Sequence, residues 1–280
     1  RRQPDKPAFI FYGAELTYRE LDQQSDRFAA MLHAGGAKKG ERIAVFLPNC
    51  PQFIVAFFGI LKAGCIHVPV NPLFKEQELL YELNDTGATW ILALDSLMPL
   101  VRAVRGQTSL TRVLATSIAE ALPAEPTFPV PESIRGAKIA CDDAEDYATL
   151  LAAAPAHAPD VEVSLDDIAA LNYTGGTTGM PKGCVHTQRD MVYTAATTCV
   201  IGMRVTSDDI ALCFYPVFWI AGEDLGIIFP VFSGMTTVLL GRWDPIGFMA
   251  AVERYKVTFA ALLVDNAVEI MDRPDNGDYD

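Results

Sequence analysis

The sequence predicts an α/β protein in which mainly parallel sheets are covered by helices. Three observations predict this class: buried-strand patterns alternate with helical patterns, 50% of the 280 residues are hydrophobic, and a glycine-rich loop follows one predicted strand. Strands separated by helices pair in parallel and need helices on both faces of their sheet. A chain of this length can bury a large core as one large domain or two.

The first 120 residues predict a short N-terminal hairpin followed by alternating helices and strands. Residues 8–18 alternate in hydrophobicity and turn near Gly13, and Thr17 with Glu20 matches a capping box for a helix that ends at about Gly35. The remaining patterns predict strands over 42–47, 65–70, 89–94 and 111–117, and helices over 51–64 and 75–87. Residues 1–120 are therefore expected to form a first α/β subdomain.

Two further segments complete the predicted organisation. Residues 121–164 are rich in Pro, Ala and acidic residues, which favours an irregular surface excursion with one helix near Tyr147 to Ala153. Residues 165–280 resume the alternation and are expected to form a second α/β subdomain, which carries the glycine loop. Its predicted strands cover 167–173, 183–187, 209–215, 236–241 and 258–264, and its helices cover 189–201 and 244–256, with Asp244 as an N-cap.

Charge and residue spacing exclude several classes of partner. A net charge of −13 repels nucleic acid and anionic lipid, so ATP-like ligands would need short-range donors. Six cysteines and four histidines are scattered without ligand-like spacing, which argues against a metal site and favours free thiols in a reducing cytoplasm. The longest apolar run is interrupted by Pro216, Glu223, Asp224 and Pro230, so no transmembrane segment is expected.

The stretch LNYTGGTTGMPKGCVHT, residues 171–187, has the composition of a phosphate-binding loop. Glycines let backbone N–H groups approach an anion, threonines add hydroxyl donors, and a lysine adds a positive charge. The pattern is not G-x-x-x-x-G-K-[ST], because Pro181 precedes the lysine and Gly183 follows it. The candidate phosphate-binding residues are Thr174, Gly175, Gly176, Thr177, Thr178, Gly179 and Lys182.

Three stretches resemble signatures of the adenylate-forming superfamily, which includes acyl-CoA synthetases, adenylation domains of peptide synthetases and beetle luciferases. YTGGTTGMPKG (173–183) is similar to its phosphate loop, with Gly175 at a position where serine is commonest. LTYREL (16–21) and LKAGCIHVPVNP (61–72) are similar to two earlier signatures, in the same order. The resemblance implies the fold of the N-terminal domain of these enzymes.

The resemblance also implies a two-step reaction. A carboxylic acid attacks the α-phosphate of ATP, with Mg²⁺, to give an acyl-adenylate and pyrophosphate, and the thiol of coenzyme A then displaces AMP. Negative charge builds up on the departing pyrophosphate, where a lysine and hydroxyl groups would stabilise it. Lys182 and Thr177 are therefore the candidate catalytic residues.

Acyl-CoA synthetases often carry a histidine where YPVFWIAGEDLG has Trp219. The resemblance implies that Trp219 and Gly222 border the acid site, although a tryptophan buried in the core is an equal alternative for Trp219. Glu223 and Asp224 are more simply explained as helix-start carboxylates than as substrate contacts. Peptide-synthetase domains usually place an aspartate after the phenylalanine of this region, so tryptophan at that position favours a plain fatty or aryl acid.

The resemblance covers only the first part of such enzymes. Their residues for adenine, ribose and Mg²⁺, and their C-terminal domain, have no counterpart in this sequence. We therefore expect an N-terminal fragment that is inactive alone and that exposes apolar surface prone to self-association. The alternatives are a non-catalytic nucleotide-binding module, a peptide-synthetase adenylation domain and a luciferase-like enzyme. His67, His186 and the six cysteines are expected to be structural.

Overall fold

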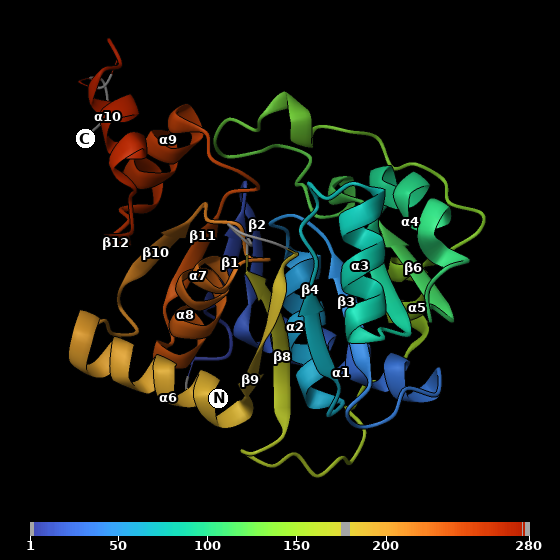
Figure 1. The fold of residues 1–280 in the computed structure, drawn as a ribbon. Coiled ribbons are helices and arrows are strands. Elements are labelled where there is room, and N and C mark those ends of the chain that lie inside the picture. Colours follow the sequence, from blue (N-terminus) through green and yellow to red (C-terminus); the bar gives the residue numbers. More distant parts are fainter. Residues whose placement is uncertain (1–2, 175–179, 276, 278–280) are drawn as a thin grey trace.

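The computed structural model describes residues 3–174, 180–275 and 277, and two mainly parallel sheets form its frame (Figure 1). In the smaller sheet only the β1–β2 pair is antiparallel. Its order is β12 (Phe259–Ala260), β10 (Ile210–Cys213), β11 (Thr236–Leu239), β1 (Pro7–Phe11) and β2 (Ala14–Thr17). The N-terminal hairpin thus completes a sheet whose other strands come from the last third of the chain.

The larger sheet is parallel except where β8 pairs with β9. Its order is β7 (Glu145–Asp146), β6 (Arg112–Thr116), β5 (Trp90–Leu94), β3 (Arg42–Phe46), β4 (Ile66–Pro69), β8 (Ile168–Thr174) and β9 (Lys182–Thr187). The predicted α/β class with mainly parallel sheets is confirmed.

Helices cover these sheets, and the strand residues alternate between two hydrophobic cores. Ile43 and Val45 of β3 join the core that also contains α1 (Tyr18–Ala34) and α2 (Pro51–Lys62). Ala44 and Phe46 point to the opposite face, where they join α3 (Glu76–Thr86) and α4 (Met98–Arg105). The other helices are α5 (Tyr147–Ala153), α6 (Gln188–Thr197), α7 (Ile220–Glu223), α8 (Phe229–Ser233), α9 (Pro245–Tyr255) and α10 (Val264–Met271).

Local signals at the N-terminus are confirmed in detail. Tyr12 and Gly13 both have positive φ, 51° and 104°, as a tight hairpin turn requires. The side chain of Thr17 accepts from the Glu20 N–H while the Glu20 carboxylate accepts from the Thr17 N–H, which completes the capping box. The hairpin and the start of α1 were therefore predictable from residues that lie close together in the sequence.

One predicted element needs correction and several helices were not predicted. The strand predicted over 258–264 is too long, because β12 pairs with β10 only at Phe259 and Ala260 and α10 begins at Val264. No range was predicted for helices α4, α7, α8 and α10. The helix predicted near 147–153 is confirmed as α5. The irregular segment 121–164 does not lie entirely on the surface, since Phe128, Val130 and Ile134 are buried in the core.

The surface around α10 exposes several large apolar side chains. Leu263, Val264 and Met271 are 59%, 78% and 73% exposed. Adjoining exposed apolar groups favour association, so self-association stays a prediction that light scattering of the 280-residue chain would test. Within the described residues, no helix is long and apolar enough to cross a bilayer.

Candidate functional site

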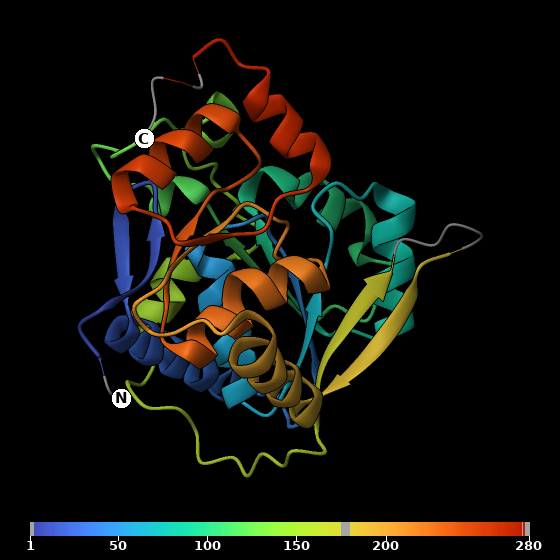
Figure 2. The same ribbon diagram turned by 90° about the vertical axis from the view of Figure 1, so that its left-hand side faces the viewer.

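The predicted phosphate loop connects β8 and β9, which Figure 2 shows leading together away from the helical layers. Thr174 and Lys182 are paired at the ends of these strands, and the Thr174 hydroxyl donates to the Lys182 carbonyl over 3.4 Å. Both residues are exposed, so the Lys182 ammonium is available to a ligand. The other candidate residues, Gly175, Gly176, Thr177, Thr178 and Gly179, lie outside the described residues.

A cavity of about 470 Å³ lies beside the base of this loop. Thr174 and Pro181 contribute from the loop side, and Phe218, Trp219 and Ile220 contribute from the segment that enters α7. The structure therefore brings one predicted phosphate-binding residue and one predicted acid-binding residue to the same space. Pro69, Asn71, Phe74, Glu82 and Tyr173 complete its lining.

Trp219 is half-exposed, and the chain before it is tightly anchored. The residue is 49% exposed, so the alternative of a tryptophan buried in the core is wrong. Asn49 fixes the preceding turn, because its Nδ2 donates to the Tyr215 carbonyl over 2.8 Å and its Oδ1 accepts from the Val217 N–H over 2.8 Å. An anchored turn that ends in a half-exposed ring is suited to form one wall of a binding cavity. The gating role of Trp219 stays a prediction.

Gly222, the other predicted acid-binding residue, is buried and does not line the cavity. A Cβ atom at this position would lie 2.1 Å from the Pro216 carbonyl oxygen and 2.9 Å from the Tyr215 carbonyl oxygen. The backbone of α7 therefore packs directly on the turn that leads to Trp219. Glycine is needed here because it has no Cβ and so permits this close approach of two backbones. Gly222 therefore affects the cavity only through the turn that carries Trp219.

Three buried polar residues, which no sequence pattern predicted as a site, form a cluster behind the cavity wall. Glu223 lies in the first turn of α7, as the helix-start interpretation requires, but its side chain is fully buried. Its Oε2 lies 3.5 Å from Nε2 of His67 and accepts from Nδ2 of Asn172 over 3.3 Å. Glu223 and His67 therefore have a role beyond that of a helix-start carboxylate and an isolated core histidine. Only the interruption of an apolar segment by Glu223 signalled this cluster.

Two carboxyl groups of α3, those of Glu82 and Asp85, lie near Tyr173 at the C-terminal end of β8. The Tyr173 hydroxyl donates to the Asp85 carboxylate, and burial together with this bond raises the pKa of Tyr173. Glu82 lines the cavity with both side-chain oxygens buried and no hydrogen-bond partner among the described residues. Burial, and secondarily the charge of Asp85, raises the pKa of Glu82 to about 8. The Glu82 carboxyl is therefore largely neutral at pH 7.

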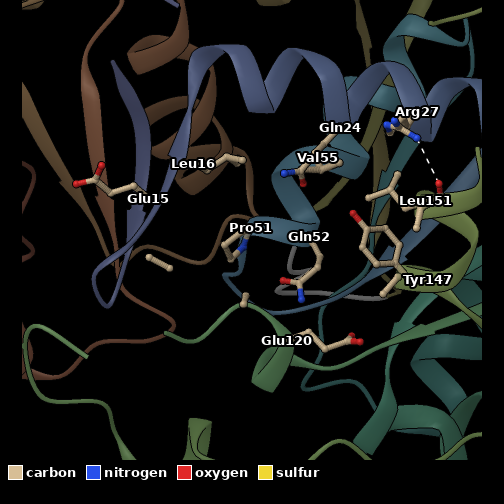
Figure 3. Close-up of a pocket in the computed structure, with 14 residues that line it drawn as sticks. Glu15, Leu16, Gln24, Arg27, Pro51, Gln52, Val55, Glu120, Tyr147 and Leu151 are labelled. Atoms are coloured by element: carbon tan, nitrogen blue, oxygen red, sulfur yellow. Dashed lines mark hydrogen bonds between the residues drawn. The ribbon is translucent and has the colours of Figure 1, made fainter. Parts of the chain in front are cut away.

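A second cavity, of about 420 Å³, lies between α1, α2 and α5 (Figure 3). Its wall combines the apolar Leu16, Val55 and Leu151 with Arg27, which donates to the carbonyl of Ala154 over 2.9 Å. None of the predicted site residues that the structure describes lines this cavity. In the same described ranges, no three His, Cys, Asp or Glu side chains gather as metal ligands would.

The whole described chain matches one known protein family. The sequence profile described as "AMP-binding enzyme" matches residues 1–277. The chain belongs to the AMP-binding enzyme family. The resemblance found in the three sequence signatures is thereby confirmed.

Two long-chain-fatty-acid–CoA ligases align with all, or with about two thirds, of the chain. A long-chain-fatty-acid–CoA ligase from Bacillus subtilis (strain 168) is 30% identical, and the alignment covers 100% of this chain and 51% of that protein. The enzyme of the same name from Salmonella typhimurium is 37% identical over 68% of this chain and 35% of its own length. This AMP-binding chain thus spans about half, or less, of the length of these relatives.

Solved structures show the same fold. The N-terminal domain of FACL13 from Mycobacterium tuberculosis, bound to an inhibitor, aligns with a TM-score of 0.83 at 25% identity, over 100% of this chain and 64% of that one. The anthranilate CoA ligase AuaEII, in complex with anthranoyl-AMP, aligns with a TM-score of 0.87 at 22% identity, over 100% of this chain and 51% of that one. The second likeness supports the fold alone. Together they confirm the architecture of an acyl-CoA ligase N-terminal domain.

Proposed function

We propose that the protein containing this chain is an ATP-dependent acyl-CoA synthetase that activates a fatty or aryl carboxylic acid. One observation carries the proposal: the base of the phosphate loop and the apolar turn ending in Trp219 line the same cavity. An acid whose apolar part contacts that turn would place its carboxylate close to the loop. Proximity of the carboxylate and the α-phosphate of ATP is the main requirement of the first half-reaction.

In this proposal the residues of the chain act mainly on the departing pyrophosphate. The ammonium of Lys182 and the hydroxyls of Thr174, Thr177 and Thr178 would stabilise the charge that develops as the bond to the α-phosphate breaks. Because the chain has a net charge of −13, these local donors must outweigh a repulsive long-range field. Mg²⁺ would enter with the ATP phosphates, and coenzyme A would supply the thiol for the second step.

The cavity favours an acid without an amino group. Phe218, Trp219 and Ile220 form an apolar wall, and no carboxylate follows Phe218 to bind an ammonium. Relatives are named for long-chain fatty acids and, in the case of a ligase from Narcissus pseudonarcissus, for 4-coumarate. These names support both acid classes for the proposal and leave the choice between them to experiment.

A pyrophosphate-release assay with the full-length protein tests the proposal. The enzyme is incubated with ATP, Mg²⁺ and coenzyme A, and with fatty acids of graded length, benzoic and cinnamic acids, or amino acids. We expect release that depends on a fatty or aryl acid and formation of the matching thioester. ATP binding without acid-dependent release would indicate a nucleotide-binding module instead. Release that depends only on amino acids would indicate a peptide-synthetase type of adenylation.

A further inference from the structure

Three elements that line the cavity each contribute one buried polar residue beneath it. His67 on β4, Asn172 on β8 and Glu223 on α7 are 0%, 5% and 0% exposed. Neighbouring residues on each of these elements, or at their ends, line the cavity, but these three do not. The cluster therefore lies where a ligand in the cavity could not touch it, at the junction of the three elements that form the walls.

The contacts in this cluster are specific and shielded from water. Glu223 Oε2 receives a hydrogen bond from Asn172 Nδ2 over 3.3 Å and faces His67 Nε2 at 3.5 Å. The rings of Phe53 and Phe57 pack edge-on against the imidazole, with centroid distances of 5.3 and 5.1 Å. Glu223 Oε1, Asn172 Oδ1 and both ring nitrogens of His67 have no hydrogen-bond partner among the described residues. The approach of the imidazole to the carboxyl is therefore a contact between two buried ionisable groups and not a hydrogen bond.

This pairing bears on the position of α7, which is the first turn of a helical stretch that continues through a π-helix (Asp224–Ile228) into α8. A helical stretch of this length is only marginally stable by itself in water. Its position must therefore come from tertiary contacts. A buried Glu223 carboxyl that shifted away from Asn172 and His67 would lose its hydrogen bond from Asn172 without gaining water, which penalises displacement of the helix.

We propose that His67, Asn172 and Glu223 are positioning residues that fix α7 against β4 and β8 and thereby set where Trp219 stands in the cavity. The proposal rests on the proposed function for its consequence, namely binding of the acid. The geometric part, the position of Trp219, is independent of any activity. Asn49 holds the chain before Trp219, and this cluster holds the chain after it.

Fluorine NMR of the full-length protein labelled with 5-fluorotryptophan tests the geometric part directly. This chain contains three tryptophans, Trp90, Trp219 and Trp243, and Trp219→Phe assigns the relevant resonance. We expect Glu223→Leu to shift or broaden the Trp219 signal while those of Trp90 and Trp243 keep their positions. Glu223→Gln, which keeps the length and an acceptor for Asn172, should retain most of the native signal.

A matched control separates positioning from general damage to the core. Thr237→Val removes a buried hydroxyl on β11 of the smaller sheet that has no hydrogen-bond partner in the described part of the chain, and it should leave all three signals in place. An unmoved Trp219 signal in folded Glu223→Leu and His67→Phe would overturn the proposal. Equal changes at all three tryptophans would overturn it as well, because they would indicate a general loss of packing.

The kinetic consequence is measured in the same variants. Glu223→Leu should raise KM for the acid by about tenfold, because a displaced Trp219 would no longer support the apolar part of the acid, with a much smaller change in KM for ATP. Equal rises for both substrates would contradict positioning of the acid wall. If the unmodified enzyme releases no pyrophosphate with any acid, the proposed function fails, whereas the NMR result still decides the role of the cluster.

Discussion

The helix pair α1–α2 and the segment around α7 both contain fully buried side chains, but different interactions hold the two regions. Phe28 of α1 fills the space above Gly59 of α2, where an added Cβ would lie 2.7 Å from the phenylalanine. In contrast, Asn49 holds the turn before α7 through a hydrogen bond to the Tyr215 carbonyl, and α7 itself is held by the hydrogen bond from Asn172 to Glu223 and by the contact of Glu223 with His67. Apolar packing therefore holds the first region, whereas buried polar groups fix the position of one turn in the second.

This difference separates stability from function. Apolar packing tolerates small shifts but loses much free energy when atoms are removed. Polar clusters contribute less net stability, because desolvation offsets their attraction, but they specify one arrangement. We therefore expect substitutions in α1–α2 to act on unfolding and substitutions near α7 and the loop to act on substrates.

The largest expected effect is on stability and comes from Phe28→Ala. This side chain is 1% exposed and packs between α2 and Tyr147, so its removal should lower the free energy of unfolding by about 3–5 kcal/mol. Denaturant titration measures the loss. Phe232→Ala, at a phenylalanine that is 46% exposed, should cost much less. Equal costs at the two positions would contradict the assignment of α1–α2 as the main apolar contact.

The same contrast explains what could be predicted from the sequence. The spacing of apolar residues predicts α1, α2 and most strands directly, because an element that buries one face has apolar residues at regular intervals in its own sequence. Helix α4 has only eight residues and contains Pro99, so its pattern is short and interrupted. The apolar run at 258–264 could not indicate that β12 would pair over two residues only, since pairing depends on a distant strand.

The candidate site was predicted only where its residues form a local motif. Thr174 and Lys182 belong to one loop signature, and Trp219 belongs to another. Glu223 and Asn172 lie 51 residues apart, and His67 is more distant still, so no spacing in the sequence connects them. Glu82 is similar: a glutamate on an amphipathic helix is expected to be exposed, and only the structure shows that it is buried and lines a cavity with residues distant in the sequence, such as Tyr173 and Trp219.

The second expected effect is on catalysis and comes from Lys182→Ala. In the full-length enzyme it should slow acyl-adenylate formation roughly a hundredfold, as expected for losing one group that stabilises the leaving charge. Thioester formation from a supplied acyl-adenylate should change little, because pyrophosphate has already left. Separate assays of the two half-reactions measure this, with the exposed Lys38→Ala as a control. Equal loss in both half-reactions would indicate a structural role for the lysine.

The third effect tests the close packing of α7 through Gly222→Ala. Alanine normally stabilises a helix relative to glycine, but here its Cβ would lie 2.1 Å from the Pro216 carbonyl oxygen. We expect a loss of about 1–3 kcal/mol and a higher KM for the acid, because the turn before Trp219 must move. Gly202→Ala is the matched control, since an added Cβ there meets nothing within 4 Å. Neutral behaviour of both variants would remove the steric argument.

The smallest effect concerns the buried carboxyl of Glu82, whose pKa is raised from about 4.5 to about 8, mainly by burial. Between these values the unfolded chain releases its proton and the folded chain keeps it, so this group lowers stability progressively as pH rises and has no further effect above pH 8. Glu82→Gln keeps the shape but cannot ionise.

Glu82→Gln and the wild type should therefore be similarly stable near pH 5. Near pH 8 the variant should be more stable by about 1–2 kcal/mol. This difference is smaller than the full pKa shift implies, because neighbouring groups relax around a buried charge. Denaturant titrations at a series of pH values measure the difference in unfolding free energy between variant and wild type. Contributions from other groups, such as Asp224, are present in both proteins and cancel in this difference. Glu76→Gln, on the exposed first turn of the same helix, should show no comparable rise. A difference that stays constant from pH 5 to pH 8 would mean that Glu82 finds a partner or water, and the cavity wall beside the loop would then carry a charge.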